Sequence, residues 1–368
     1  MALELCRGKT KYLSIIVTES CNLNCVYCYE KHKTPRKGDF QTIINFIDCE
    51  DNKDDEFDHI MVDFFGGEPF VNFELIKRVV GYYKKKHPKK KMHFFATTNG
   101  TLVHGKIKQW LKNNANYFTC GLSLDGDRDS QNYNRSNSFD LIDLNFFASL
   151  YKGQHIKMTI SPYSLKNLAN DVIFCNQNGF DVSCNFAYGF NWEEKKCLDE
   201  IEKQLNILSK FYITNPQYRP CDMLNGSIKI CKKDDKYARR WCGATTNSMT
   251  TLGVDGKTYY CQQLLPITSE KGSGMPKIPD LIDKNLLPFN CAKCRLVDIC
   301  PTCYSSNFVN YGNPYIKDPG SCQIQQTILK CRAQFLINMW DNGLLKLKPE
   351  DEKALLIQYK EIKDYLNF

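Results

Sequence analysis

The first half of the chain alternates between short runs of β-branched or aromatic residues and segments with helical periodicity. The predicted strands are residues 11–18, 60–65, 91–97, 117–124, 156–161 and 181–188. The predicted helices between them are residues 42–48, 73–86, 106–113, 141–151 and 168–178. Strands that alternate with helices in this way form a parallel sheet, either open or curled into part of a barrel. In such sheets, functional side chains gather where the strands end.

The second half of the chain has a different character. Residues 193–214 are predicted to form one helix that leaves the sheet, and cysteine, glycine and turn residues become frequent from Pro220 onward. Residues 254–259 contain an Asp-Gly pair that indicates a β-hairpin. Residues 324–340 and 349–365 have helical patterns. We therefore expect a domain boundary near residue 215, with domains over residues 1–215, 216–335 and 336–368.

Cysteine is the most unusual part of the composition, with 19 residues in a chain of 368. The N-terminal stretch has no signal-peptide pattern, and no apolar run approaches the roughly 20 residues of a membrane span. We therefore expect a cytoplasmic protein without a membrane partner, in which dense cysteine indicates metal binding or catalysis. The net charge is +8, and the basic runs 84–86 and 89–91 are typical of solvated surface, or of contact with an acidic peptide. No basic stripe interleaved with aromatic residues indicates a nucleic-acid partner.

Cys21, Cys25 and Cys28 follow the first predicted strand with the spacing C-x3-C-x2-C. So short a loop can bring three thiolates to one cubane iron–sulfur cluster, each on a separate iron. Three ligands leave the fourth iron open, as a catalytic metal requires. The alternatives are a zinc site that lacks one ligand, or unrelated cysteines in the core. The spacing directly after a strand favours the cluster.

With Tyr27 as its aromatic residue, this loop resembles the signature of the radical S-adenosylmethionine superfamily. The resemblance implies that S-adenosylmethionine chelates the open iron and is cleaved reductively to a 5′-deoxyadenosyl radical, which removes a hydrogen atom from a substrate. The expected fold class is α/β: a partial (β/α)6 barrel of the TIM type, followed by a small cysteine-rich domain with a β-hairpin and by C-terminal helices.

Motifs at the later strand ends add to the resemblance. Gly66-Gly67-Glu68 resembles the motif that binds the methionyl ammonium group. Arg135 would pair with the methionyl carboxylate, although Gln131-Asn132 stands where relatives often carry His-Asp. Ser123 would contact the ribose or the carboxylate, and by position Ser161 and either Phe186 or Tyr188 would contact the ribose and adenine. The residues expected to bind S-adenosylmethionine are Tyr27, Gly66, Gly67, Glu68, Asn99, Ser123, Arg135 and Ser161.

Seven more cysteines lie between residues 242 and 322, and their spacing alone leaves a zinc ribbon open. The pattern is similar to the SPASM extension of radical S-adenosylmethionine enzymes, which implies two auxiliary 4Fe–4S clusters and three clusters in all. By that likeness Cys242, Cys261 and Cys303 ligate the first, with Cys231, Cys221 or no cysteine as the fourth ligand. Cys291, Cys294, Cys300 and Cys322 ligate the second. The other cysteines are expected to be small buried hydrophobic residues: Cys6, Cys49, Cys120, Cys175, Cys184, Cys197 and Cys331.

Enzymes with this extension mostly modify peptides. We expect a maturase of a ribosomally made peptide that forms a thioether or carbon–carbon crosslink or epimerises a residue. A formylglycine-forming sulfatase maturase is the alternative, but Gln262 stands where that group typically carries an aspartate. The expected partners are a precursor peptide, an electron donor such as flavodoxin or ferredoxin, and a separate leader-binding protein, because Cys21 lies too early for an N-terminal leader-binding domain. Other classes are a zinc-stabilised binding protein without catalysis and a radical enzyme acting on a small molecule.

Overall fold

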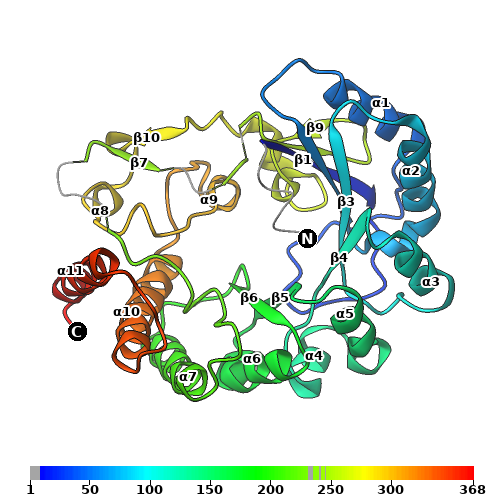
Figure 1. The fold of residues 1–368 in the computed structure, drawn as a ribbon. Helices are drawn as coiled ribbons and strands as arrows, with labels where there is room; N and C mark the ends of the chain where they lie inside the picture. The colour runs from blue at the N-terminus through cyan, green and yellow to red at the C-terminus, as the bar shows by residue number, and fades with distance from the viewer. Residues whose placement is uncertain (1–8, 231–234, 240–241, 245) are drawn as a thin grey trace.

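The computed structural model describes residues 9–230, 235–239, 242–244 and 246–368. Its first half contains the six predicted strands, which run β1 to β6 along the chain and curve into part of a barrel (Figure 1). Their bounds are β1 (Thr10–Thr18), β2 (His59–Gly66), β3 (Lys91–Thr98), β4 (Phe118–Leu122), β5 (His155–Ile160) and β6 (Asp181–Phe186). The predicted parallel α/β architecture is therefore confirmed.

Parallel pairing links β1 to β2, β2 to β3 and β3 to β4, and a separate parallel pair joins β5 to β6. An isolated bridge between Ser123 and Lys157 connects the two sheets, supported by a 3.1 Å hydrogen bond from the Leu124 amide to the Lys157 carbonyl. Because all of these pairs are parallel, the carboxyl ends of the strands meet on one side of the sheet.

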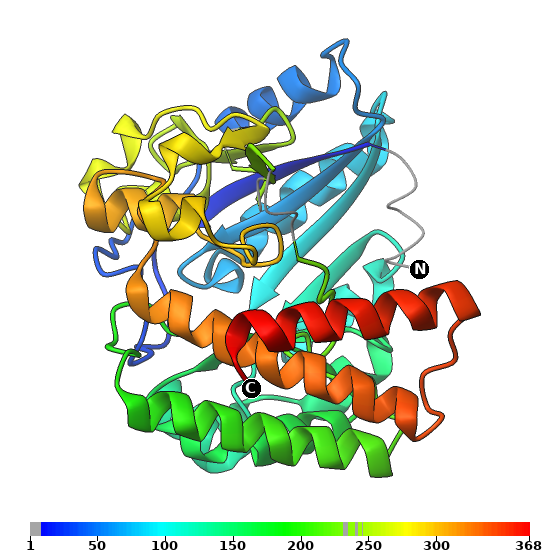
Figure 2. The same ribbon diagram turned by 90° about the vertical axis from the view of Figure 1, so that its left-hand side faces the viewer.

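Helices cover the outer side of the barrel (Figures 1 and 2). Burial alternates along β2, whose Ile60, Val62 and Phe64 face these helices. Helix α2 presents buried Ile76 and Val79 to the sheet, as its apolar periodicity predicts. The helices of this half are α1 (Phe40–Asp51), α2 (Phe73–Lys86), α3 (Gly105–Asn114), α4 (Arg128–Asn134), α5 (Leu144–Leu150), α6 (Leu168–Gln177) and α7 (Lys195–Thr214).

The cysteine-rich region has little regular structure. Its strands are β7 (Tyr237–Arg239), β8 (Met249–Leu252), β9 (Thr258–Tyr259) and β10 (Leu281–Asp283), and its short helices are α8 (Phe289–Ala292) and α9 (Tyr304–Tyr311). The predicted hairpin is formed by β8 and β9, while β7 and β10 make a second antiparallel pair. Strand β8 also pairs in parallel with β1, so the hairpin extends the sheet of the barrel.

The chain ends in two long helices, α10 (Pro319–Asp341) and α11 (Pro349–Leu366). The predicted boundary at residue 335 falls inside the continuous helix α10. Phe335 of α10 packs edge-on against Tyr212 of α7, with ring centroids 6.2 Å apart, so α10 shares the main apolar core. Among the described residues, no helix is both long enough and apolar enough to cross a membrane.

The expectation that every unassigned cysteine is buried is wrong for Cys49. Cys120, Cys175 and Cys331 are buried, but Cys49 is exposed. It lies on the face of α1 turned away from the core, which Ile43 and Ile47 of the same helix enter instead. Cys184 and Cys197 are half-buried, and Cys6 lies outside the described residues.

Candidate active site

The loop that carries the first three cysteines, residues 18–30 (the cluster loop), leaves the end of β1 and is fastened to the end of β2. The amide of Gly67 donates to the carbonyl of Thr18 at 3.1 Å, and the amide of Glu68 donates to the carbonyl of Ser20 at 3.0 Å. Gly66 has φ +128°, a conformation open to glycine, and a Cβ there would lie 2.0 Å from the Thr18 oxygen. Glycine is therefore required where β2 meets the cluster loop.

Gly67 makes an equally close approach. A Cβ at Gly67 would lie 2.4 Å from the Ser20 carbonyl oxygen and 3.0 Å from the Cβ of Cys21. The Gly-Gly pair thus holds the first cysteine in place through backbone contact.

Glu68 is turned into the protein and is 1% exposed. Its carboxylate accepts from the Thr98 hydroxyl at 2.8 Å and from the amide of Asn99 at 2.8 Å. Burial raises the pKa of Glu68 to about 7 despite these hydrogen bonds. Its side chain therefore ties the end of β2 to the end of β3.

Asn99 extends this link to the cluster loop. Its side-chain amide donates to Asn22 at 3.0 Å, and Asn22 in turn donates to the Thr101 hydroxyl at 2.8 Å. The outer side of the loop is held as well, because the amide of Asn24 donates to the Ser136 hydroxyl at 2.9 Å. Polar side chains that follow β3 and α4 thus fix the loop from both sides.

Asp125, two residues after Ser123, has no role predicted from the sequence. It is 1% exposed, and its carboxylate accepts from the Tyr27 hydroxyl and from the Thr159 amide, the latter at 2.9 Å. Arg135 approaches the same carboxylate at 3.0 Å and lies over the Tyr27 ring, 5.4 Å from its centroid. Tyr27 and Arg135, two of the predicted ligand-binding residues, are thereby brought together beneath the cluster loop.

Gln131, one of the pair that replaces His-Asp, supports this arrangement. Its side-chain oxygen accepts from the amide of Asp125 at 2.8 Å, and its nitrogen donates to the Ser138 hydroxyl at 2.9 Å. The substitution therefore keeps a buried polar group in hydrogen-bonding contact with the strand end that carries Asp125.

The two predicted serines lie at the ends of β4 and β5. The amide of Ser123 donates to the Thr98 carbonyl at 2.8 Å. Ser161 is 1% exposed, and its hydroxyl donates to the side chain of Asn134 at 2.7 Å. Ser161 thus orients the segment that precedes Arg135, and its hydroxyl is already engaged within the protein.

The three thiols of the cluster loop are half-buried and lie within electrostatic reach of one another. Burial raises the pKa of Cys21 to about 11 and also raises the pKa of Cys25, while the charges of Lys33 and Arg135 act in the opposite direction. The Lys33 ammonium lies 3.1 Å from the Cys28 sulfur. Thiolates at such positions need strong positive charge nearby, which a bound iron–sulfur cluster supplies.

Cys242, Cys261 and Cys303 form a first thiol group. Burial raises the pKa of Cys261 to about 11, and the charges of the neighbouring Cys303 and Cys242 also raise it. The sulfur of Cys261 lies 2.9 Å from the Ser305 hydroxyl. The amide of Ser306 donates to the Cys303 sulfur at 3.4 Å. Hydrogen bonds from protein groups to the sulfurs are a feature of iron–sulfur ligands.

Cys291, Cys294, Cys300 and Cys322 form a second thiol group. Burial raises the pKa of Cys291, and the charges of its three companions raise it further. The ammonium of Lys317 lies 2.6 Å from the Cys300 sulfur, and the amide of Leu296 donates to Cys294 at 3.4 Å. The thiols within each set lie in electrostatic reach of one another, and their assignment to two clusters stays a prediction.

Two cysteines were candidates for a fourth ligand of the first thiol group, and the structure describes only one of them. Cys221 is fully buried in the main core and is hydrogen-bonded to Cys184. Cys231 lies outside the described residues. Among the residues that are described, no three His, Cys, Asp or Glu side chains converge as the ligands of one ion do. A cubane places each thiolate on a separate iron, so its ligands stand further apart.

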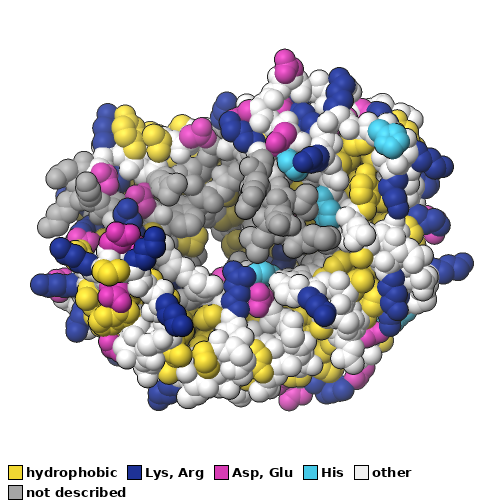
Figure 3. Space-filling model, viewed as in Figure 1, with side chains coloured by type: hydrophobic (Ala, Val, Ile, Leu, Met, Phe, Trp, Pro, Cys, Tyr) yellow, Lys and Arg dark blue, Asp and Glu magenta, His cyan; other side chains and the backbone are white. Residues whose placement is uncertain are grey.

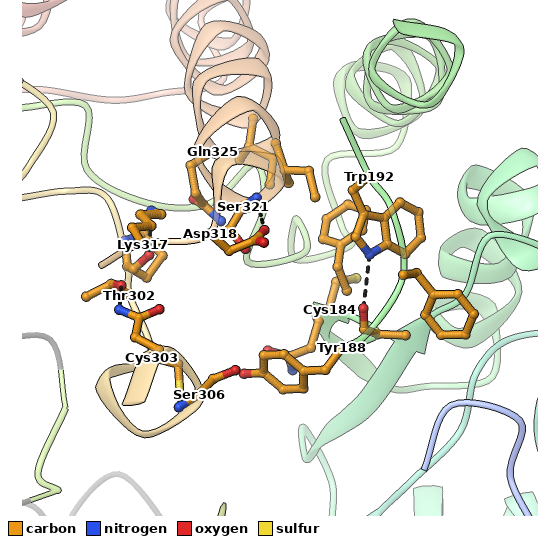
Figure 4. Close-up of a pocket in the computed structure, with 18 of the residues that line it drawn as sticks. Cys184, Tyr188, Trp192, Thr302, Cys303, Ser306, Lys317, Asp318, Ser321 and Gln325 are labelled. Carbon is orange, nitrogen blue, oxygen red and sulfur yellow. Dashed lines mark hydrogen bonds between the residues drawn. The ribbon is translucent and has the colours of Figure 1, made fainter. Parts of the chain in front are cut away.

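A cavity of about 570 Å³ separates the first thiol group from the end of β6 and the start of α10 (Figure 4). Tyr188 and Trp192 lie on one side of it, and Lys317 and Asp318 lie on the other. A second, smaller cavity of about 240 Å³ reaches Tyr27 and Cys28 of the cluster loop. The two cavities share lining residues, which are Tyr188, Gly189, Phe190, Ser306 and Asn310. A substrate could therefore extend from the cluster loop to the first thiol group.

Residues 15–142 match the family model described as the Radical SAM superfamily. The matched segment begins in β1, includes the cluster loop and ends after Arg135. The chain carries a radical SAM domain. Within this domain lie Tyr27, the Gly-Gly pair and Asp125, together with the three thiols that they surround.

Curated relatives extend the likeness to different degrees. This chain is 38% identical to the uncharacterised protein MJ0907 of Methanocaldococcus jannaschii over 116 residues, which are 32% of this chain and 39% of that protein. The radical SAM cyclopropyl synthase TigE of Paramaledivibacter caminithermalis is 22% identical over 87% of this chain and 73% of its own. The chain thus spans about two fifths of the first relative and about three quarters of the second.

Solved structures share the fold beyond the radical SAM domain. The structure of anSMEcpe with bound AdoMet and the Cp18Cys peptide superposes with a TM-score of 0.67 at 18% identity, covering 90% of this chain and 99% of that one. Streptococcus suis SuiB bound to the precursor peptide SuiA gives a TM-score of 0.56 at 19% identity, over 85% and 76% of the two chains.

Proposed function

We propose that this chain is a radical S-adenosylmethionine enzyme that modifies a peptide by removing a hydrogen atom from one of its residues. The observation that carries the proposal is the pair of adjoining cavities, which lead from Cys28 to Cys242 and Cys303. A space of this length suits a peptide segment better than a single small metabolite. The likeness to structures solved with bound peptides supports the same substrate class.

In this proposal Cys21, Cys25 and Cys28 hold the catalytic 4Fe–4S cluster. When bound, the cluster and S-adenosylmethionine supply the one-electron chemistry that removes a hydrogen atom. The backbone of Gly66 and Gly67 receives the methionyl ammonium, and Arg135 pairs with the methionyl carboxylate after Asp125 has oriented it. Tyr27, Asn99, Ser123 and Ser161 shape the site around these groups.

The two thiol groups are proposed to hold auxiliary 4Fe–4S clusters, so the loaded protein carries about twelve irons. The first thiol group faces the cavity, where its cluster would accept an electron or bind a substrate group. The second is covered by Lys317 and by Tyr365 of α11, whose pKa is raised to about 12 by burial and by its hydrogen bond to Cys294. An external donor such as flavodoxin or ferredoxin and a separate leader-binding protein complete the proposed system.

The proposed products are a thioether or carbon–carbon crosslink, or an epimerised residue. A formylglycine-forming activity is a second candidate, favoured by the fold shared with anSMEcpe over 90% of this chain. Gln262 counts against it, because a carboxamide at this position cannot act as the base that an aspartate provides.

The test is to incubate the anaerobically reconstituted protein with dithionite, S-adenosylmethionine and a short peptide encoded beside its gene. We expect the peptide to lose the mass of two hydrogen atoms, or to exchange one hydrogen with solvent if the product is an epimer. A peptide whose cysteine or serine becomes an aldehyde would favour the second candidate. S-adenosylmethionine cleavage that no peptide accelerates or consumes would contradict a peptide substrate.

A further inference from the structure

The larger cavity contains two acidic and two basic side chains, and all four are engaged within the protein. The carboxylate of Asp222 accepts from the Ser183 hydroxyl at 2.6 Å and from the Cys184 amide at 2.9 Å. The guanidinium of Arg332 donates to the carbonyls of Met223 and Asp222, both at 3.0 Å. Neither side chain has its main hydrogen-bonding groups free for a ligand.

The second pair of charges is occupied in the same way. Lys317 is held 2.6 Å from the sulfur of Cys300, one of the second thiol group. Asp318 caps helix α10, where its carboxylate accepts from the Ser321 amide at 2.8 Å and from the Tyr311 hydroxyl at 3.0 Å. The two negative and two positive side chains sum to zero formal charge, so the cavity lining offers no net electrostatic attraction to a charged substrate side chain.

Three neutral amide side chains line the cavity and make no hydrogen bond within the part of the chain that the structure describes. They are Asn185 of β6, Asn310 of α9 and Gln325 of α10. Each offers a carbonyl oxygen that accepts and an amino group that donates. That combination matches the C=O and N–H groups of a peptide backbone, and it comes from three separate elements around the cavity.

Aromatic and aliphatic side chains supply the rest of the lining. Tyr188 and Phe190 are 47% and 38% exposed, and both lie where the two cavities meet. Trp192 is held in place by a hydrogen bond from its indole nitrogen to the Ala187 carbonyl at 3.0 Å (Figure 4). Ile324 of α10 adds a buried apolar surface. Such a lining favours apolar substrate side chains.

We propose that this cavity binds an uncharged segment of the peptide, with Asn185, Asn310 and Gln325 holding its backbone and Tyr188 and Phe190 packing against its side chains. The inference rests on the proposed function and narrows it, because it names the kind of sequence that surrounds the modified residue.

Binding without turnover tests the inference. The reconstituted protein is dialysed anaerobically with S-adenosylmethionine, without reductant, against short blocked peptides of glycine and serine whose central residues are Val-Phe-Val, Val-Lys-Val or Val-Glu-Val. We expect the neutral peptide to bind and both charged peptides to bind roughly tenfold more weakly or worse. Equal binding of the three peptides, or no binding of the neutral one, would overturn the inference.

Variants show whether the three carboxamide side chains bind the backbone of the neutral peptide. Replacing Asn185, Asn310 or Gln325 by Ala is expected to weaken binding of the neutral peptide by roughly threefold to tenfold each. N310D is expected to strengthen binding of Val-Lys-Val several-fold, a gain that misfolding cannot produce. The matched control is N113D on the exposed surface of α3, which should leave all three affinities unchanged.

Unchanged affinities in all three alanine variants, or no gain in N310D, would place the peptide elsewhere and overturn the inference. The same preparation, once reduced, reports 5′-deoxyadenosine formation independently. The formation of 5′-deoxyadenosine therefore tests the proposed enzyme function separately from the charge preference of the cavity.

Discussion

In the barrel, the cluster loop lies on a continuous apolar core and is fixed by backbone hydrogen bonds and close-packed glycines. The seven later cysteines, by contrast, lie mostly on loops and short elements. The core beneath β1 to β4 includes Phe64, Phe94 and Phe118, each fully buried. The apolar cluster beside the first thiol group is much smaller and centres on Leu264, Met275 and Ile278. Apolar burial is the main source of folding free energy, so the two regions differ in what stabilises them.

We therefore expect the barrel to present its three thiols before any metal is bound, whereas the cysteine-rich region would need its proposed clusters in order to fold. Charge does not separate the two regions in the same way. Figure 3 shows Lys and Arg side chains spread around the outline of one face and interspersed with acidic ones.

Removing the iron is expected to have the largest effect, and mainly on the cysteine-rich region. Metal binding to a small domain without a large core is part of its folding free energy, on the order of 10 kcal/mol for structural zinc. After anaerobic chelation, hydrogen exchange should become fast in α9 and in the β7–β10 pair and stay slow in β2 and β3. The variant C322A should give a milder form of this result, and C197A on α7 is its control. Equal loss of protection in the barrel strands would contradict the contrast.

Within the barrel, D125N should be the most damaging polar substitution. It leaves Arg135 buried beside a neutral group, and breaking a buried ion pair costs about 3–5 kcal/mol. The free energy of unfolding from urea titration measures the loss.

The control for D125N is D140N, which breaks the exposed pair between Asp140 and Arg128. It should leave the urea midpoint nearly unchanged. If the two variants lose equal stability, Asp125 is not the buried anchor described above.

Gly67→Ala should cost about 1–3 kcal/mol, because its Cβ would overlap the Ser20 carbonyl. It should also reduce the iron bound at the cluster loop, as seen by electron paramagnetic resonance of the reduced protein. Gly81→Ala in α2 is the control, since a Cβ there meets nothing within 4 Å. That change should stabilise the protein by about 0.5–1 kcal/mol. A G67A protein with normal stability and a full cluster would show that the close approach is unimportant.

The smallest effect concerns Asp63 of β2. Burial raises the pKa of this carboxyl group to about 7. The folded state then holds a proton that the unfolded state releases near pH 4, so stability falls as the pH rises from about 4 to 7. Replacing Asp63 by Asn removes this penalty. The variant should be more stable than the parent by about 1–2 kcal/mol at pH 8, with the gap closing near pH 4. Urea titrations at both pH values measure it, and a gap independent of pH would refute it.

The strands and helices of the barrel could be predicted because burial alternates along strands such as β2 and because the helices carry apolar stripes. The pairing of β8 with β1 could not be predicted, since the four residues Met249–Leu252 carry no sign of their partner. The predicted domain boundary at residue 335 is not supported by the helix itself, because the predicted helix over residues 324–340 and the observed helix α10 both continue through it.

The candidate site was predictable where spacing brings residues together, as in the cluster loop and the strand-end glycines. The contacts of Asp125 with Tyr27, Thr159 and Arg135 join segments far apart in the sequence, so only the fold reveals them. The unpartnered carboxamides of the cavity are likewise visible only once their neighbours are known.

The most direct test of the central claim is the formation of 5′-deoxyadenosine. The reconstituted protein is incubated anaerobically with dithionite and S-adenosylmethionine, and the product is quantified by chromatography and mass spectrometry. The account predicts 5′-deoxyadenosine from the parent protein and none above background from C21A, while C21A keeps the auxiliary iron. No product from a parent protein that holds its full iron, or equal product from C21A, would contradict it.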